Sequence, residues 1–247
     1  MLRWCIVVLL LFYVAFLPAQ RIQYDCRQCT LTTEDKWKIQ KVAEYETAFF
    51  ADVFGSRRRQ TIRIRYYGDE KLFMKAQRRA VGRVISETGL YSPTSKQILV
   101  FKWSRFLATS YHECVHAIYH HHANIRPTWI NEGMAEYFKG AVIDSAGNIT
   151  IQEVPSRKTA MKKLVSDSSF SIRSTLRASH RKFHGRHENR NYTTSWGIVY
   201  FLRSQHDDIF KLILHNVSAG VKSDKAIEDH YVGGLAQLEK DLVKFYK

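Results

Sequence analysis

Cysteine is scarce in this sequence, with four in 247 residues. Cys5 lies in the apolar N-terminal segment, so removal of that segment would leave Cys26, Cys29 and Cys114, an odd number that cannot pair completely. No second Cys-x-x-Cys accompanies Cys26 and Cys29, which disfavours a four-cysteine zinc site. We find no βαβ pattern that would favour a thioredoxin-like redox pair. The pair could form a local disulfide in an oxidising compartment, which the sequence does not decide, and Cys114 is expected to be buried and inert.

Long apolar runs are absent beyond the N-terminus, so no later segment is expected to span a membrane. Residues 1–19 place Arg3 before an apolar run that ends at Leu17, Pro18 and Ala19, the pattern of a signal peptide. Because Leu17 is larger than the residue preferred three positions before a cut, an uncleaved N-terminal anchor is the alternative. The protein is therefore expected to be exported, either to the periplasm or as a secreted protein.

Internal repeats and low-complexity linkers are also absent, which favours a single domain over residues 32–247, preceded by the Cys-x-x-Cys segment 20–31. Lysine and arginine number 38 against 23 acidic residues, a net charge of +15. The basic residues gather at Arg57–Arg59, 76–83 and 180–190, without a recognisable nucleic-acid module. We expect no nucleic acid partner, and an anionic envelope surface, cell-wall polymer or acidic substrate fits better. A solvated basic face is the alternative.

The polarity pattern predicts an α+β fold, with a small, mostly antiparallel sheet placed early and helices placed late. A capping threonine at Thr32 or Thr33 and Gly55 bound the first predicted helix. Strict alternation of apolar and polar residues marks a strand at 61–67, and a Ser-Pro-Thr-Ser turn joins a hairpin over 90–101. A second hairpin is predicted over 140–152, and further helices over 69–81, 107–123, 131–138, 159–165, 192–205, 208–217 and 233–247.

Two histidines and a glutamate form an HExxH motif in the segment SYHECVHAIYHHHA, residues 110–123. His112 and His116 are four residues apart, so on a helix their side chains differ in direction by about 40° and can share one ion. Glu113 is rotated about 100° from His112 and can reach a water on that ion without ligating it, which suits a general base. HExxH on a helix is a zinc signature, but it also occurs by chance, so the hypothesis needs a third ligand.

Two residues compete as that third ligand. His122 lies six residues after His116, the interval of the last histidine in the metzincin pattern HExxHxxGxxH. That pattern needs a glycine for a sharp turn where this chain has Tyr119, so the metzincin interpretation is disfavoured. Glu132 follows a break at Pro127, and a second helix there can return its carboxylate to the ion. Two histidines, one glutamate and an open position for water would result.

The residues around Glu132 and after the motif also carry expectations. Glu136 is on the same helix face as Glu132 and could accept a hydrogen bond from the outer nitrogen of a ligand histidine. Gly133 leaves room for close helix packing beside the ion. We expect His120 and the histidines at 121–122 to lie at a solvated helix end, with a substrate contact as the alternative for His120.

The segment WINEGMAEY after HECVH resembles the gluzincin metallopeptidases, in which an HExxH helix is followed by an Asn-Glu segment. A nearer resemblance is to the peptidase MA-like domain family of small exported or envelope proteins. That family shares a leading amphipathic helix, a strand like IRIRYYGD, a hairpin like GLYSPTSKQILVF, the PxWxNEGxAEYF segment, and helices like YTTSWGIVYFL and LAQLEKDLVKFY. The resemblance covers most of the chain from about Thr32. It implies a gluzincin-like fold in which His112, His116 and Glu132 ligate one zinc ion and Glu113 is the catalytic base.

We therefore expect an exported zinc metallopeptidase that cleaves peptide bonds with a zinc-activated water. A donor to the oxyanion is needed besides the metal, and Tyr192, His184 and His187 are candidates among which the spacing does not choose. Simple helix packing is the alternative for Tyr192. Two other functions remain open: a non-catalytic cell-envelope binding or assembly module, and a zinc hydrolase of a non-peptide cell-wall amide. The intact Glu113 favours an enzyme over the module.

Overall fold

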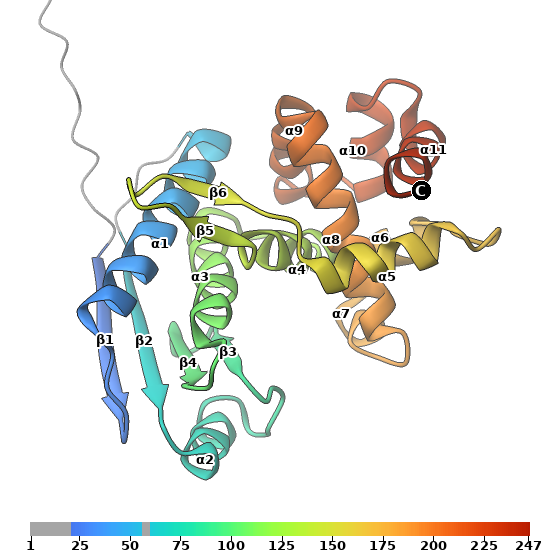
Figure 1. Cartoon of the computed structure of the whole chain (residues 1–247). Helices are drawn as coiled ribbons and strands as arrows, with labels where there is room; N and C mark the ends of the chain where they lie inside the picture. Colours follow the sequence, from blue (N-terminus) through green and yellow to red (C-terminus); the bar gives the residue numbers. More distant parts are fainter. Residues whose placement is uncertain (1–20, 56–59) are drawn as a thin grey trace, which may run out of the picture.

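The computed structural model describes residues 21–55 and 60–247 (Figure 1), so the expected signal segment, 1–19, and Arg57–Arg59 lie outside the described residues. The elements follow one another as β1 (Arg21–Arg27), α1 (Thr33–Phe54), β2 (Thr61–Tyr67), α2 (Glu70–Val81), β3 (Gly89–Ser92), β4 (Gln97–Phe101), α3 (Phe106–His122), α4 (Thr128–Phe138), β5 (Ala141–Ile143), β6 (Ile149–Ile151), α5 (Pro155–Val165), α6 (Arg173–Leu176), α7 (His180–Phe183), α8 (Glu188–Gln205), α9 (Asp207–Ser218), α10 (Ser223–His230) and α11 (Gly234–Tyr246).

A four-stranded sheet in the order β1-β2-β4-β3 occupies one side of the molecule, and β5 and β6 form a separate hairpin (Figure 1). The α+β class is confirmed. The prediction of a mostly antiparallel sheet is wrong, because β1 pairs with β2 and β2 pairs with β4 in parallel, and only β3 runs antiparallel to its neighbour β4. The sequence does not predict the strand β1. Together with α1 and β2 this strand forms a βαβ unit, whose sheet pairing is parallel.

Cys26 lies in β1 and Cys29 follows the end of this strand, so the pair belongs to a βαβ unit that the sequence does not predict. Cys26 and Cys29 are both free thiols in this structure. Burial raises the pKa of the Cys29 thiol, and the neighbouring Cys26 adds to the effect. A raised thiol pKa is the opposite of what an activated redox cysteine needs. Cys114 is buried, as expected.

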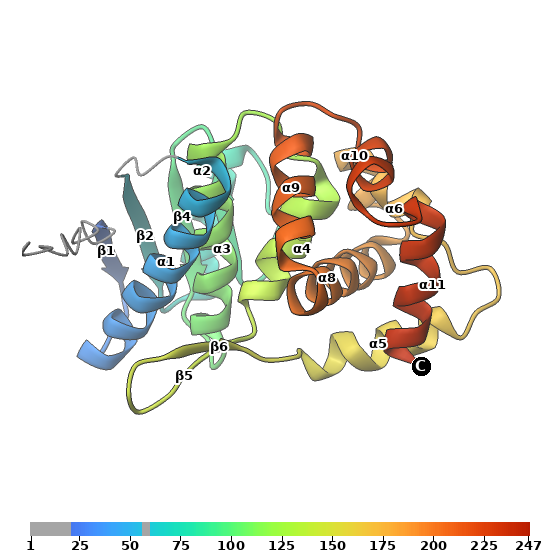
Figure 2. The same cartoon turned by 90° about the horizontal axis from the view of Figure 1, so that it is seen from above.

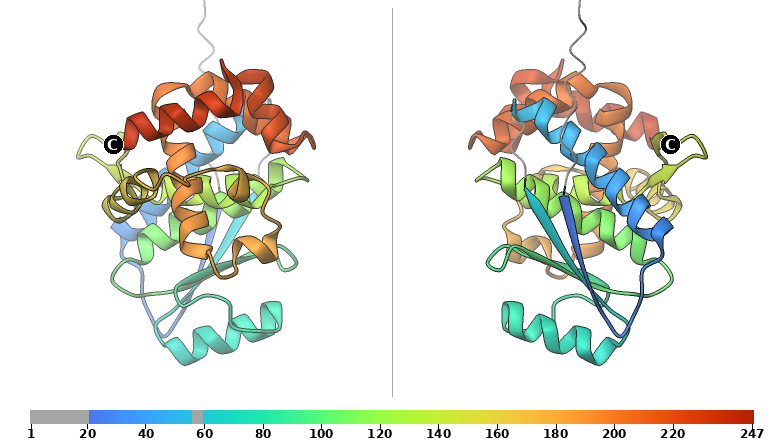
Figure 3. Two further views of the ribbon diagram at one scale, coloured as in Figure 1. Left: turned by 90° about the vertical axis from the view of Figure 1, so that its right-hand side faces the viewer. Right: turned by 90° about the vertical axis from the view of Figure 1, so that its left-hand side faces the viewer.

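The two faces of the sheet pack against different helices. Ile62, Ile64 and Tyr66 of β2 are buried in the main core, where α1 and α3 also contribute. Tyr67 packs on the other face in a second cluster with Phe73 of α2. Helix α2 therefore lies on the far side of the sheet from α1 and α3 (Figure 3). This alternation follows from the period of two along a strand.

Local signals set the ends of the first helix as predicted. The Thr32 side chain accepts a hydrogen bond from the backbone of Asp35, whose side chain accepts one from the Thr32 backbone, a complete capping box. Gly55 ends α1 with a positive φ of 63°, a conformation that costs glycine little.

Helices form the other side of the molecule around α8. Helix α8 packs against α4, α5, α9 and α11, and Figure 2 shows it between them.

Several helices begin earlier than predicted: α4 at Thr128, α5 at Pro155 and α8 at Glu188. Proline suits the first turn of a helix, which explains the start of α5. The short helices α6, α7 and α10 were not predicted. In the described ranges, none of the helices combines the length and apolarity needed to cross a membrane.

Candidate metal centre

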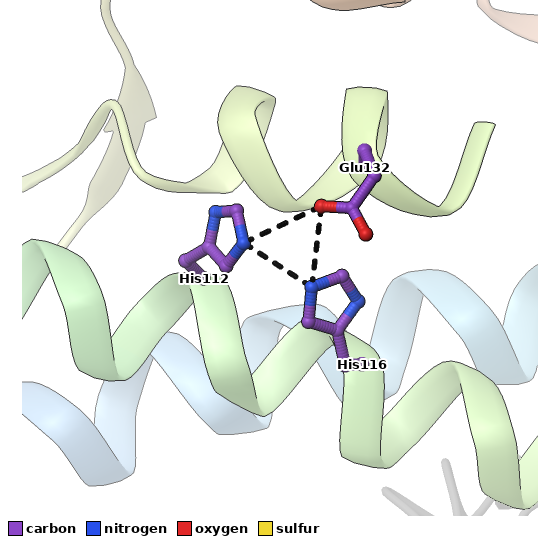
Figure 4. A group of neighbouring side chains, drawn as sticks. All are labelled: His112, His116 and Glu132. Carbon is purple, nitrogen blue, oxygen red and sulfur yellow. Dashed lines mark hydrogen bonds and ion pairs between the residues drawn. The ribbon is translucent and has the colours of Figure 1, made fainter. Parts of the chain in front are cut away.

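Three side chains from α3 and α4 converge on one point, as Figure 4 shows. The Nε2 atoms of His112 and His116 are 3.2 Å apart. Glu132 Oε2 lies 3.7 Å from His112 Nε2 and 3.6 Å from His116 Nε2. These three residues could hold a metal ion. The structure therefore brings together the three ligands predicted from the sequence.

The positions of α3 and α4 explain this convergence. His112 and His116 lie one turn apart on the same face of α3, as their spacing predicts. The chain leaves α3 at Ala123 and begins α4 directly after Pro127, which places Glu132 above the two imidazoles (Figure 4). At Gly133 an added Cβ would come within 2.8 Å of the Ser195 carbonyl oxygen in α8. Glycine at this position therefore allows α4 to pack closely on α8 and fixes the helix that carries Glu132.

Glu132 is the buried member of this group, and the His112 and His116 side chains are partly buried. Glu132 is 7% exposed, and its Oε2 accepts no hydrogen bond from the described residues. A buried carboxylate oxygen without a partner is costly. A cation at the centre of the three donor atoms would satisfy Glu132 Oε2, so the residues present fit a bound metal.

The Glu136 carboxylate contacts the ligand candidate His112 and two basic side chains. Its Oε1 lies 3.2 Å from the outer ring nitrogen of His112, Nδ1, and its carboxylate also pairs with Lys139 at 3.1 Å and with Arg157 Nε at 2.8 Å. Burial alone would raise the pKa of Glu136, but the hydrogen bond with His112 and the surrounding positive charges outweigh it and hold this pKa well below its usual range. An ionised Glu136 orients the His112 ring with Nε2 toward the centre, as we expected.

Glu113 lies at the edge of the same site, between α3 and the edge strand β3. It is 6% exposed, and burial raises the pKa of its carboxyl although the neighbouring histidines act in the opposite direction. The backbone N–H of Tyr91 in β3 donates a hydrogen bond to it. A Cβ on Gly89 would lie 2.3 Å from Thr109 Cγ2 and 3.1 Å from Glu113 Oε1. Only glycine at residue 89 therefore allows β3 to lie this close to the Glu113 side chain.

A cavity of about 880 Å³ opens onto the three donor side chains and Glu113. Of the three predicted oxyanion donors, His184 and Tyr192 line this cavity and His187 does not. His184 Nε2 is 3.9 Å from Glu132 Oε1. Burial and then the charge of Glu132 raise the pKa of Tyr192, so its hydroxyl stays protonated and able to donate. His187 is exposed where α8 begins.

The remaining histidines of α3 are held by other contacts. His120 also lines the cavity, and its Nδ1 lies 2.7 Å from the Tyr91 hydroxyl. His122 stacks against Phe50 and Phe54 of α1, and burial lowers its pKa to about 4. His122 therefore packs in a neutral form away from the candidate metal centre, and the metzincin alternative has no structural support.

Sequence reasoning missed two features of the site. Arg157 reaches Glu136 from α5, a segment that carries no motif. Gly89 governs the approach of β3 to α3, and nothing in its neighbourhood marks it as different from an ordinary turn glycine. Both depend on tertiary packing between distant parts of the chain.

Part of the chain matches a known protein family. Residues 106–221 are similar to a family whose description is "Protein of unknown function (DUF1570)". The matched region runs from the start of α3 past the end of α9 and so contains all three candidate ligands. None of the curated proteins matches the chain. The description of this family names no activity.

Proposed function

We propose that this protein is a zinc-dependent hydrolase of peptide bonds, with His112, His116 and Glu132 as metal ligands and Glu113 as the general base. The observation that carries the proposal is the spacing of the three donor atoms, 3.2, 3.6 and 3.7 Å. In a tetrahedral zinc site with bonds of about 2.1 Å, neighbouring ligand atoms are separated by about 3.4 Å. Two of the three separations are too long for hydrogen bonds, so a shared ion explains them better than direct contact.

The set of donors supports zinc among the common metals. Two imidazoles and one carboxylate leave a fourth tetrahedral position open, the arrangement of catalytic rather than structural zinc sites. Magnesium and calcium prefer sites built of oxygen atoms. When bound, zinc would lower the pKa of a coordinated water toward about 7 and polarise a carbonyl group.

The residues of this chain would supply the remaining steps. Glu113 is placed to accept a proton from water at the site and to deliver it to the leaving amine. The Tyr192 hydroxyl faces the same cavity and stays protonated, so it can donate to an oxyanion. We favour it over His184, because His184 Nδ1 lies 3.0 Å from Glu188 Oε1 and donates its proton there, and a neutral imidazole then has no proton to donate from Nε2.

An extended peptide is the substrate that the cavity wall favours. Gly89, Leu90 and Tyr91 of β3 line the cavity, and β3 is the outermost strand of the sheet. An edge strand can pair with the backbone of an added peptide and place one of its bonds beside the site. A cell-wall amide would need to fit against β3 in the same cavity. Peptides and cell-wall amides should therefore both be assayed as substrates.

The experiment compares the parent protein with the Glu113→Gln and Glu132→Ala variants. We expect one equivalent of zinc in the parent and in Glu113→Gln, and much less in Glu132→Ala. Peptide hydrolysis should occur only in the parent. Hydrolysis by Glu113→Gln at the parent rate would rule out the proposed base. Zinc without any hydrolysis of peptide or cell-wall amide would favour the non-catalytic envelope module.

We also propose that the protein is exported, because residues 1–19 have the pattern of a signal peptide. Fractionation of cells that express the full chain would test this, with N-terminal sequencing to separate a cleaved signal from an anchor. Recovery of the uncut chain in the cytoplasm would contradict the proposal.

A further inference from the structure

A second cavity lies on the opposite side of the sheet from the candidate metal centre. This cavity, which we call the basic groove, has a volume of about 530 Å³ and lies between α2 and the outer face of β1, β2 and β4. Figure 3 shows α2 on this side, with α1 and α3 on the other. The two cavities share no lining residue among those described. A ligand bound in the basic groove would therefore contact none of the residues that line the cavity at the candidate metal centre.

The charged residues that line the basic groove are all positive. Arg27 and Arg65 come from β1 and β2, while Lys75 and Arg79 come from α2, and no described acidic residue lines the groove. Four positive charges around one small volume repel each other unless an anion lies between them. The charge of the groove selects an anionic ligand.

Asp25 organises the strand side of the groove. It faces Arg65 across the β1–β2 pair, and its Oδ2 lies 2.6 Å from Arg65 Nε. Its Oδ1 lies 3.1 Å from Arg27 Nε. One carboxylate thus holds two guanidinium groups side by side that would otherwise separate, and it neutralises only one of their two charges.

On the helix side of the groove, the positive charges are not paired with acidic side chains among the described residues. Lys75 and Arg79 are one turn apart on the same face of α2, and neither forms an ion pair with the described residues. Ala76 and Ala80 line the groove beside them. The small alanine side chains leave the space between helix and strands unfilled, so both cations can reach a ligand in the groove.

We propose that the basic groove binds a phosphate group, either free or esterified in a small molecule or a lipid headgroup. Paired guanidinium groups match the oxygen atoms of phosphate in a planar, two-point geometry, and a lysine adds a compact charge. A phosphate offers several acceptor oxygens and up to two negative charges, which suits four cations better than a single carboxylate does. Tyr67 and Leu99 on the floor of the groove would contact the apolar part of an ester.

Binding of inorganic phosphate and of glycerol phosphate, followed by backbone amide NMR shifts of the full-length protein, tests the proposal. We expect shifts at Ala76 and Ala80, and binding weakened about tenfold or more in a Lys75→Gln, Arg79→Gln variant. Lys162→Gln, Lys163→Gln is the matched control, because it removes the same charge from an exposed part of α5 outside the groove. Equal binding by the two double variants, or no binding by the parent, would overturn the proposal.

The Asp25→Asn variant separates an organised site from simple attraction by charge. It raises the net charge of the region by one, so nonspecific attraction predicts tighter binding. Loss of the carboxylate also releases Arg27 and Arg65 from their fixed positions, so an organised site predicts weaker binding. Weaker binding supports the proposal, and tighter binding overturns it.

Vesicles distinguish the sources of the phosphate group. Vesicles of phosphatidylglycerol and phosphatidylcholine are compared with vesicles of phosphatidylcholine alone in a flotation assay. Flotation that depends on phosphatidylglycerol and on Lys75 and Arg79 assigns a lipid headgroup. Binding of soluble phosphates without flotation assigns a small molecule. Flotation that persists equally in both double variants would contradict a role for the groove.

Discussion

Glu136 Oε1 lies 3.2 Å from His112 Nδ1, whereas Glu132 is approached by the other ring nitrogen, Nε2. A carboxylate at this position favours a proton on Nδ1 and leaves Nε2 available to a metal ion. Carboxylates that orient a ligand histidine in this way typically change metal affinity when they are removed.

Glu136→Gln should therefore weaken zinc binding by about 10- to 100-fold, because the charge that holds His112 in place is lost. Competition with a zinc chelator measures the affinity. Glu188→Gln is the control, since Glu188 is an exposed carboxylate that pairs with the non-ligand His184. Equal zinc affinity in the Glu136→Gln variant and the parent would show that Glu136 does not orient the ligand.

Gly89→Ala should reduce both activity and stability. The new methyl group would lie 2.3 Å from Thr109 Cγ2, so β3 must move away from Glu113, at a cost of about 1–3 kcal/mol. Denaturant unfolding and peptide hydrolysis measure the two effects.

The Thr109→Ser change removes the clashing methyl group while keeping the hydroxyl that Trp103 Nε1 reaches at 3.4 Å. We expect Gly89→Ala to be partly rescued when it is combined with Thr109→Ser, which alone should be nearly neutral. A double variant as damaged as Gly89→Ala would refute the proposed clash.

Glu46→Gln should stabilise the protein at neutral pH. Glu46 is fully buried in α1, and neither carboxyl oxygen has a hydrogen-bond partner among the described residues. Burial raises the pKa of Glu46 well above its usual value. Burial and then the charge of Glu46 raise the pKa values of Tyr111 and Cys114 in α3, so both groups stay neutral in this range.

The sign of the pH effect follows from that shift. The folded state favours protonated Glu46, so the contribution of this group to stability is complete below about pH 4.3 and is lost as pH rises toward the folded pKa. The free energy of unfolding of Glu46→Gln minus that of the parent should be constant in acid and then grow by up to about 1.4 kcal/mol per pH unit. Urea unfolding at several pH values measures it, and a difference independent of pH would count against this account.

Tyr192→Phe should lower kcat by about 10²- to 10³-fold with little change in KM or zinc content, because a donor to the oxyanion acts in the transition state. Phenylalanine keeps the packing of the ring, so a merely structural tyrosine would leave kcat unchanged. His187→Ala should match the parent, since His187 is exposed and does not line the cavity.

The sequence predicts the local features of this site well. The helical period alone places His112 and His116 together, and the break at Pro127 allows Glu132 to return. The feature it fails to predict is contact between distant segments. Strand β1 has its partner forty residues away, with Arg21 opposite Thr61, and its pairing changes the sheet from mostly antiparallel to mostly parallel.

The candidates for the oxyanion donor illustrate the same limit. His184 and His187 are three residues apart in a basic segment without a clear period, and only the packing of α7 and α8 turns the first toward Glu132 and leaves the second exposed. A choice between them needs the path of the chain through tertiary structure, which spacing alone does not supply.

The most direct test of the account is a crystal structure of the zinc-loaded protein, with anomalous scattering measured at the zinc edge. The account predicts one strong peak within about 2.0–2.2 Å of His112 Nε2, His116 Nε2 and a Glu132 carboxylate oxygen. A peak elsewhere, or a Glu132 side chain that points away from the two imidazoles, would contradict it.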